Sequence, residues 1–219
     1  MPCFAPSEFL ITPTASAFGA IAESIIAGDY LQDVGRTSFF PASALDFQDI
    51  GVGFGNTVLY IAFLKSRHPS LSIIALAALS AGGLVKIPDL MTSDAPTRTE
   101  FYEIKPNSIT GRAAGTVKIA MIDALMVAHS LPYVPGTKFT PNKKIMLFSG
   151  TPLGAKLDVF FHFQRIAPAL IVYDICAEGD LAKLGLAALL AILAIIIAIL
   201  IRRGLPGGLP GPIPVPALA

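Results

Sequence analysis

Charged side chains are scarce in this chain, and that scarcity limits the class of protein it can be. Only 14% of the 219 residues are charged, whereas hydrophobic residues make up 53% and the mean hydropathy is +0.67. An average soluble domain carries roughly 25% charged residues. Intrinsic disorder over most of the chain is excluded, because it needs low hydrophobicity and high charge. The length suits one or two domains with a sizeable core.

Cysteine and N-terminal basic residues are also few. The two cysteines, Cys3 and Cys176, cannot build a disulfide framework and match no metal-ligand spacing. They therefore do not indicate whether the protein resides in an oxidising or a reducing compartment. Residues 1–30 contain no Lys or Arg and therefore lack the basic region of a secretory signal peptide. If the protein leaves its cell, we expect a route that does not depend on a signal peptide.

Several common catalytic patterns are missing. The three histidines are far apart in sequence, and the Ser149-Gly150 stretch lacks the G-x-S-x-G elbow of serine hydrolases. The glycines of residues 51–55 form neither a Walker motif nor a dinucleotide fingerprint. These absences argue against a histidine-rich metal site, a serine hydrolase and a nucleotide-binding loop.

One long apolar run stands near the C-terminus. Residues 184–201 contain no charged or polar side chain, and Lys183 precedes them while Arg202 and Arg203 follow. A bilayer core needs about 20 apolar residues in a helix, with about 17 as the lower limit. The run predicts a membrane-inserting helix; the alternative is a buried core helix or a hairpin of shorter helices. Residues 204–219 are rich in Gly and Pro and predict a polyproline-like or disordered tail.

Charge is unevenly distributed along the chain. Residues 1–50 carry six acidic side chains and one basic, whereas residues 105–165 carry eight basic and two acidic. A basic central stretch favours an anionic partner such as nucleic acid, with DNA preferred over RNA, although an ordinary solvated surface would have the same composition. The residues that we expect to contact nucleic acid are Arg112, Lys138, Lys143 and Lys144.

The order of predicted elements indicates a mixed α/β fold with a central sheet flanked by helices. Helical periodicity predicts helices over residues 15–31, 58–67, 72–81 and 111–129, and strand patterns predict strands over 84–91, 98–105, 144–148, 157–163 and 169–175. We divide the chain into an N-terminal helical region (1–83), an α/β core (84–180), the membrane-type helix (181–203) and the tail (204–219).

The chemistry is expected in the first two strands. If residues 84–91 and 98–105 pair as a hairpin around a polar turn at 92–97, Asp89 lies beside Glu103. Two carboxylates at one point suit Mg²⁺ or Mn²⁺, and the backbone carbonyl of Ile104 is a possible further ligand. Lys105 shares a face with Glu103, because strand side chains alternate, and its charge can stabilise an attacked phosphodiester. The alternative is that Glu103 and Lys105 are surface charges on an edge strand and that Asp89 caps a turn.

Pro88-Asp89 followed by Glu103-Ile104-Lys105 resembles the PD-(D/E)XK nuclease superfamily. Residues 102–108, followed by Gly111 and Gly115, further resemble the restriction-endonuclease-type toxin domains of bacterial polymorphic toxins. The resemblance implies an αβββαβ-type core, Asp89 and Glu103 as metal ligands, and Lys105 as the catalytic lysine. It also implies a polar residue on the following helix, here Lys118, and a Glu on an early helix, for which Glu23 is a candidate.

The expected function is therefore that of a metal-dependent endonuclease acting as an antibacterial effector. Such a toxin implies a cognate immunity protein and a secretion-apparatus or chaperone partner. The alternative is a non-enzymatic, membrane-inserting toxin or structural membrane protein that acts through residues 184–201. The protein would then be membrane-associated rather than a secreted effector.

Overall fold

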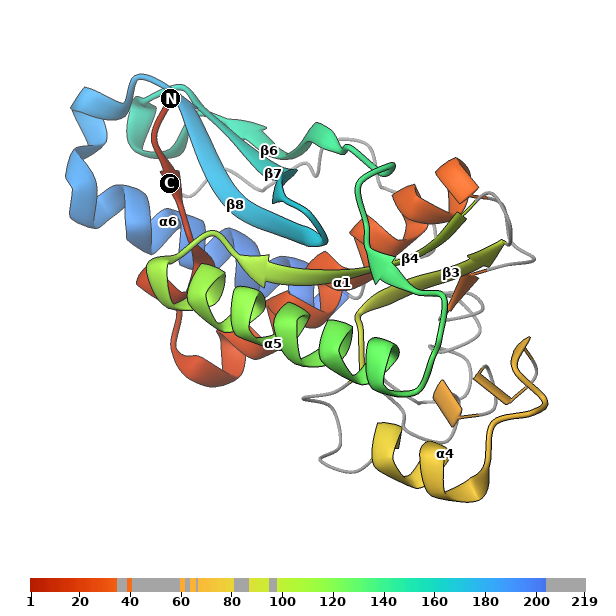
Figure 1. The fold of residues 1–219 in the computed structure, drawn as a ribbon. Helices are drawn as coiled ribbons and strands as arrows, with labels where there is room; N and C mark the ends of the chain where they lie inside the picture. The colour runs from red at the N-terminus through yellow and green to blue at the C-terminus, as the bar shows by residue number, and fades with distance from the viewer. Residues whose placement is uncertain are drawn as a thin grey trace.

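The computed structural model describes residues 1–34, 39–40, 60–61, 64–65, 67–80, 87–94 and 98–203. These residues form a mixed α/β fold in which a curled sheet is flanked by helices (Figure 1). The expected fold class is thus confirmed at this level. The glycine loop at 51–55 and the tail at 204–219 lie outside the described residues.

The sheet is mixed, and its centre joins two antiparallel units through one parallel pair. The strand order is β2 (Phe39–Phe40), β3 (Leu90–Asp94), β4 (Arg98–Pro106), β8 (Leu170–Gly179), β7 (Leu157–Ala167) and β6 (Asn142–Gly150). β3–β4 and β6–β7–β8 are antiparallel, whereas β4 and β8 run parallel. Two short strands complete the sheet: β1 (Cys3–Phe4) pairs with β8, and β5 (Val134–Pro135) pairs with β4.

Helices cover both faces of this sheet (Figure 1). On β4, Tyr102 and Ile104 belong to the larger core together with α1 (Thr12–Val34) and α6 (Leu181–Arg203). Phe101 belongs to the smaller core together with Ile122 of α5 (Ile109–Ala128). Neighbouring residues of β4 therefore serve opposite cores, as the alternation of a strand requires. The remaining described elements are the short helices η1 (Pro6–Glu8), α4 (Ile73–Ser80) and η4 (Pro152–Gly154).

Most expected elements are present, but the first expected strand is misplaced. Residues 87–89 are not strand, and β3 instead extends from Leu90 through Asp94, into the segment expected to be a polar turn. Pro88 has no N–H to donate to a ladder, whereas Thr92 pairs with Glu100 across the hairpin and is fully buried. Residues 84–86 and 95–97 lie outside the described part. Of the helix expected over 58–67, the described residues are helical.

The apolar C-terminal run forms α6, which packs on the larger core. Leu193 and Ile197 are fully buried there, beside residues of α1 and the sheet. By length and composition alone, residues 181–202 could also cross a membrane. Gly185 has φ +69°, which interrupts regular helix geometry near its start. The packing corresponds to the expected alternative of a core helix, although much of the outer surface of α6 remains exposed.

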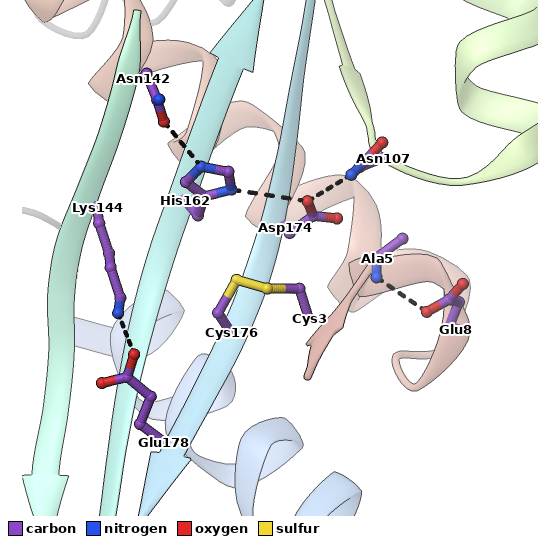
Figure 2. Close-up of a disulfide and its surroundings, with 10 residues drawn as sticks. All are labelled: Cys3, Ala5, Glu8, Asn107, Asn142, Lys144, His162, Asp174, Cys176 and Glu178. Atoms are coloured by element: carbon purple, nitrogen blue, oxygen red, sulfur yellow. Dashed lines mark hydrogen bonds and ion pairs between the residues drawn. A yellow bond between two sulfur atoms is a disulfide. The ribbon is translucent and has the colours of Figure 1, made fainter. Parts of the chain in front are cut away.

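Cys3 and Cys176 form a disulfide between β1 and β8, which the sequence had left open (Figure 2). The bridge joins positions 173 residues apart and fixes the N-terminal segment to the centre of the sheet. Closing so long a loop restricts the unfolded chain more than the folded one.

Loss of this disulfide should lower the free energy of unfolding by about 2–5 kcal/mol, because the open unfolded chain regains entropy. Urea unfolding of wild type, with and without a thiol reductant, and of the Cys3→Ser/Cys176→Ser double variant measures the difference. The double variant should not respond to reductant. Equal stability of oxidised and reduced wild type would contradict the prediction.

Candidate active site

The β3–β4 hairpin brings Asp89 and Glu103 to the same point. In the register of the two strands Leu90 lies opposite Tyr102, so Asp89, one residue earlier, lies opposite Glu103. The amide of Asp89 donates to the carbonyl of Tyr102 at 3.1 Å, and Oδ2 of Asp89 accepts from the amide of Ile104 at 2.8 Å. These backbone contacts hold the carboxylate of Asp89 beside β4 at the start of β3, which is the expected juxtaposition.

Two ammonium groups bind both carboxylates. Lys105 Nζ donates to Glu103 Oε1 and lies 3.5 Å from Asp89 Oδ2. Lys118 Nζ lies 3.2 Å from Asp89 Oδ1 and 2.9 Å from Glu103 Oε2. Each lysine therefore contacts both acids. The side chain of Glu103 is fully buried, and the other three are 12–23% exposed. The alternative of solvated surface charges on an edge strand is wrong, because β4 is central and the cluster is largely buried.

Lys118 reaches the two carboxylates because α5 lies close to the sheet. The hydroxyl of Ser108 caps the helix by accepting from the amide of Gly111 at 3.0 Å. One turn later, a Cβ on Gly115 would lie 2.6 Å from Leu170 Cδ1 and 3.1 Å from Lys105 Cγ. Glycine therefore allows α5 to lie against β4 and β8. Lys118, three residues further along the same helix face, then reaches the carboxylates.

Glu23 of α1 belongs to the same electrostatic cluster. Burial raises its pKa to about 8, the charges of Asp89 and Glu103 add to that rise, and Lys105 and Lys118 oppose it. The phenol of Tyr173 on β8 is nearby: burial, then the charge of Glu23, raises its pKa. Tyr173 Oη lies 3.3 Å from where a Cβ of Gly19 would stand, one helical turn before Glu23. No local sequence pattern indicates Tyr173, because only the β4–β8 pairing places it here.

The two central carboxyl groups differ in their proton affinity. Burial raises the pKa of Glu103 to about 8, with the charge of Asp89 as the next cause. Burial also acts to raise the pKa of Asp89, but Lys118, Lys105 and the amide of Ile104 together hold it below its usual value. Burial tends to lower the pKa values of Lys105 and Lys118, yet Asp89 and Glu103 raise both above the ordinary lysine value. Asp89 is therefore the charged carboxylate, and both lysines keep their protons.

The carboxylate oxygens of this site already have cationic neighbours. Glu103 Oε2 is buried and lies 2.9 Å from Lys118 Nζ, while Oε1 accepts from Lys105 Nζ. The carbonyl of Ile104 accepts from Lys105 Nζ at 3.0 Å. Within the described residues, no three His, Cys, Asp or Glu side chains are grouped as a metal site. Mg²⁺ usually takes only one or two protein carboxylates, so a pair of oxygen-bearing side chains is a sufficient donor set.

The four residues expected to contact nucleic acid do not gather around this cluster. Lys143 pairs with Asp29 and Lys144 pairs with Glu178, and as neighbours on β6 they point to opposite faces of the sheet. Arg112 Nε donates to Asn107 Oδ1 at 2.6 Å at the start of α5. The amide of Lys138 donates to Glu100 Oε2 at 3.3 Å. β7 and β8 separate β6, which carries Lys143 and Lys144, from β4 of the cluster.

A second polar network, also not anticipated, lies beside the disulfide (Figure 2). Asp174 Oδ2 accepts from Asn107 Nδ2 at 2.5 Å and lies 3.9 Å from His162 Nδ1. His162 Nε2 lies 3.3 Å from Asn142 Oδ1. The register of β7 and β8 pairs His162 with Asp174, and no spacing in the sequence indicates that register. The network connects three strands and the residue pair before α5 through two hydrogen bonds and the 3.9 Å contact between His162 and Asp174.

Comparison with protein-family models, with curated proteins and with solved structures finds no match to this chain. Any function assigned to the cluster therefore depends on its own geometry and chemistry.

The raised pKa of Glu103 predicts a specific pH dependence of stability. Between the ordinary carboxyl value of 4.5 and about 8, folded Glu103 holds a proton that the unfolded chain has released. Stability from this group is therefore complete below 4.5 and is lost as pH rises toward 8. Relative to Glu103→Gln, wild type should lose unfolding free energy between pH 5 and pH 8 in buffer free of divalent cations. Chemical unfolding at a series of pH values measures the difference.

The matched control is Glu178→Gln, which removes an exposed carboxylate of β8. Its stability should follow wild type across the same pH range. A constant offset between wild type and Glu103→Gln would show that Glu103 is charged throughout, contrary to the prediction.

Proposed function

We propose that this protein is a metal-dependent nuclease whose active site is the cluster of Asp89, Glu103, Lys105 and Lys118. The observation that carries the proposal is the convergence of two carboxylates and two lysines where β3 begins beside β4. This is the constellation that the resemblance to PD-(D/E)XK nucleases implies. Phosphodiester hydrolysis suits such a site, because its transition state accumulates negative charge on oxygen.

The donor set fits a divalent cation. Asp89, Glu103 and the carbonyl of Ile104 would hold Mg²⁺ or Mn²⁺, since these are hard oxygen ligands on adjacent backbone positions. The burial of Glu103 supports this assignment, because a buried carboxylate is costly unless a cation compensates it. When bound, the metal would supply Lewis-acid stabilisation and activate water. Lys105 and Lys118 now neutralise the same oxygens, so binding requires at least one of them to turn away.

The lysines act as permanent positive charges in this proposal. Because its carboxyl partners raise the pKa of Lys105, this side chain stays protonated at neutral pH and cannot serve as a general base. Its role is to stabilise negative charge on the attacked phosphate, in a site where burial strengthens the interaction. Lys118 supplies a second charge from α5. Glu23 is close enough to influence every group in the cluster and is proposed as a further acidic residue of the site.

The proposal also covers the substrate and the biological setting of the protein. We favour DNA as the substrate and an antibacterial effector as the setting, because residues 102–108 with Gly111 and Gly115 resemble toxin nuclease domains. The Cys3–Cys176 disulfide supports exposure to an oxidising compartment, where such bridges form and persist. Such a toxin would need a cognate immunity protein in the producing cell and a delivery or chaperone partner.

Lys105→Ala is the decisive variant. Removing one preorganised charge should lower the rate of DNA cleavage in Mg²⁺ by roughly a hundredfold or more. Lys105→Arg should restore little, since a planar guanidinium does not reproduce a compact ammonium. Asp89→Asn and Glu103→Gln should abolish cleavage, and so should a chelator. Plasmid and RNA degradation, followed on gels, measures these outcomes.

Lys183→Ala is the control, because Lys183 lies at the start of α6 and pairs with Asp180 at 2.9 Å. All variants must show the circular dichroism of wild type. Equal cleavage by wild type and Lys105→Ala would end the nuclease assignment for this site. Metal-independent binding of DNA without cleavage by wild type would instead indicate a nuclease-like domain that only binds.

A further inference from the structure

The outer side of α5 carries an apolar seam that no other described element covers (Figure 1). Ile109, Val117 and Val127 expose 90%, 60% and 72% of their surface on this side. The opposite side, which includes Lys118 and the buried Ile122, faces the sheet. Spacings of four and three residues place the members of the seam in one line along the helix: Ala113, Val117, Ala120, Ala124 and Val127.

The composition of the seam suits contact with a second helix. Valine and alanine share the line, and no charged side chain interrupts it. Alanine lets two helix axes approach to about 8 Å, the short end of the usual range, while valine fills the space beside it. Spacings of four and three residues are those of helices that pair along their length. The seam is therefore suited to helix pairing rather than to an open contact with water.

The order of residues along α5 is self-complementary for an antiparallel pair. In such a pair two residues meet when they are equally far from the two-fold axis that relates the copies. The midpoint between Ile109 and Val127 falls between residues 117 and 119, and so does the midpoint between Ala113 and Ala124. One two-fold axis at this level therefore brings the exposed Ile109 of each copy to the exposed Val127 of the other.

The charges beside the seam fit the same axis. Arg112 and Asp123 are eleven residues apart, close to three full turns, so they lie on the same flank of the helix. They are about 16 Å apart along the axis, too far to pair within one copy. Arg112 uses its Nε on Asn107, and no ion pair joins Asp123 to another described residue. Their midpoint also falls between residues 117 and 119, so an antiparallel pair places each Arg112 opposite Asp123 of the other copy.

We propose that the outer side of α5 binds α5 of a second copy of this chain, antiparallel, around a two-fold axis at the level of Lys118. The pair buries both seams and forms two Arg112–Asp123 contacts between the copies. One pair of 20-residue helices covers less area than the roughly 1,200 Å² of a stable interface, so the dimer is weak and forms at high protein concentration. Lys118 itself remains on the sheet side, and the proposal does not depend on nuclease activity.

Charge reversal in the full-length, disulfide-bonded protein tests the contact between copies. Sedimentation velocity at rising protein concentration measures association. Arg112→Asp and Asp123→Arg should each dimerise roughly tenfold or more weakly than wild type, because each dimer then opposes two pairs of like charges. An equimolar mixture of the two variants should regain wild-type association, because the mixed dimer contains two pairs of opposite charge. Mixing cannot rescue a variant that has failed to fold.

Val117→Glu tests the seam, and Ile195→Glu, at a position of α6 that is 53% exposed, is the matched control. Val117→Glu should abolish dimerisation, because it buries a carboxylate without a partner, whereas Ile195→Glu should associate like wild type. Both should keep the circular dichroism of wild type. A protein that stays monomeric at every concentration would overturn the proposal. So would a dimer that Val117→Glu leaves intact, a dimer that Ile195→Glu dissociates, or a mixture of the charge variants that associates no better than its components.

Discussion

Contact between two carboxyl groups and two ammonium groups allows the centre of this fold to contain charge. A buried carboxylate alone carries a heavy desolvation cost, and Glu103 is fully buried on a central strand. Asp89 reaches it from the hairpin, Lys105 from the same strand and Lys118 from the covering helix, so three elements must be in place together. The charges of the cluster therefore compensate one another only when β3, β4 and α5 are packed together.

Two glycine residues allow the helices to pack closely enough for these charges to meet. Gly115 lets α5 approach Leu170 and Lys105 closely enough for Lys118 to contact both acids. On the opposite face, Gly19 leaves space for the phenol of Tyr173 one turn from Glu23. Both glycines therefore act through the absence of a side chain. The result is an unequal pair of carboxyl groups, with Asp89 charged and Glu103 inclined to hold a proton, which is a common arrangement in functional sites.

Helices close both faces of the sheet. α1 and α6 close the larger core. α5 closes the smaller core and supplies Lys118 to the cluster. Glu23 of α1 also belongs to the electrostatic cluster, so both faces of the sheet contribute charged groups to it.

The sequence by itself determined the mixed α/β class, the helix over α5 and the side-by-side position of Asp89 and Glu103, because local periodicity and one hairpin specify them. It misplaced the first strand, since the polar residues after Asp89 are held in β3 by pairing rather than by propensity. Tertiary structure alone decided that α6 packs on the sheet, that Cys3 meets Cys176, and that Tyr173 and the His162–Asp174 pair have polar neighbours. It also separated the basic residues of the central stretch, because neighbours on a strand face opposite ways. These features depend on strand register and on contacts between distant segments, which no local pattern of residues encodes.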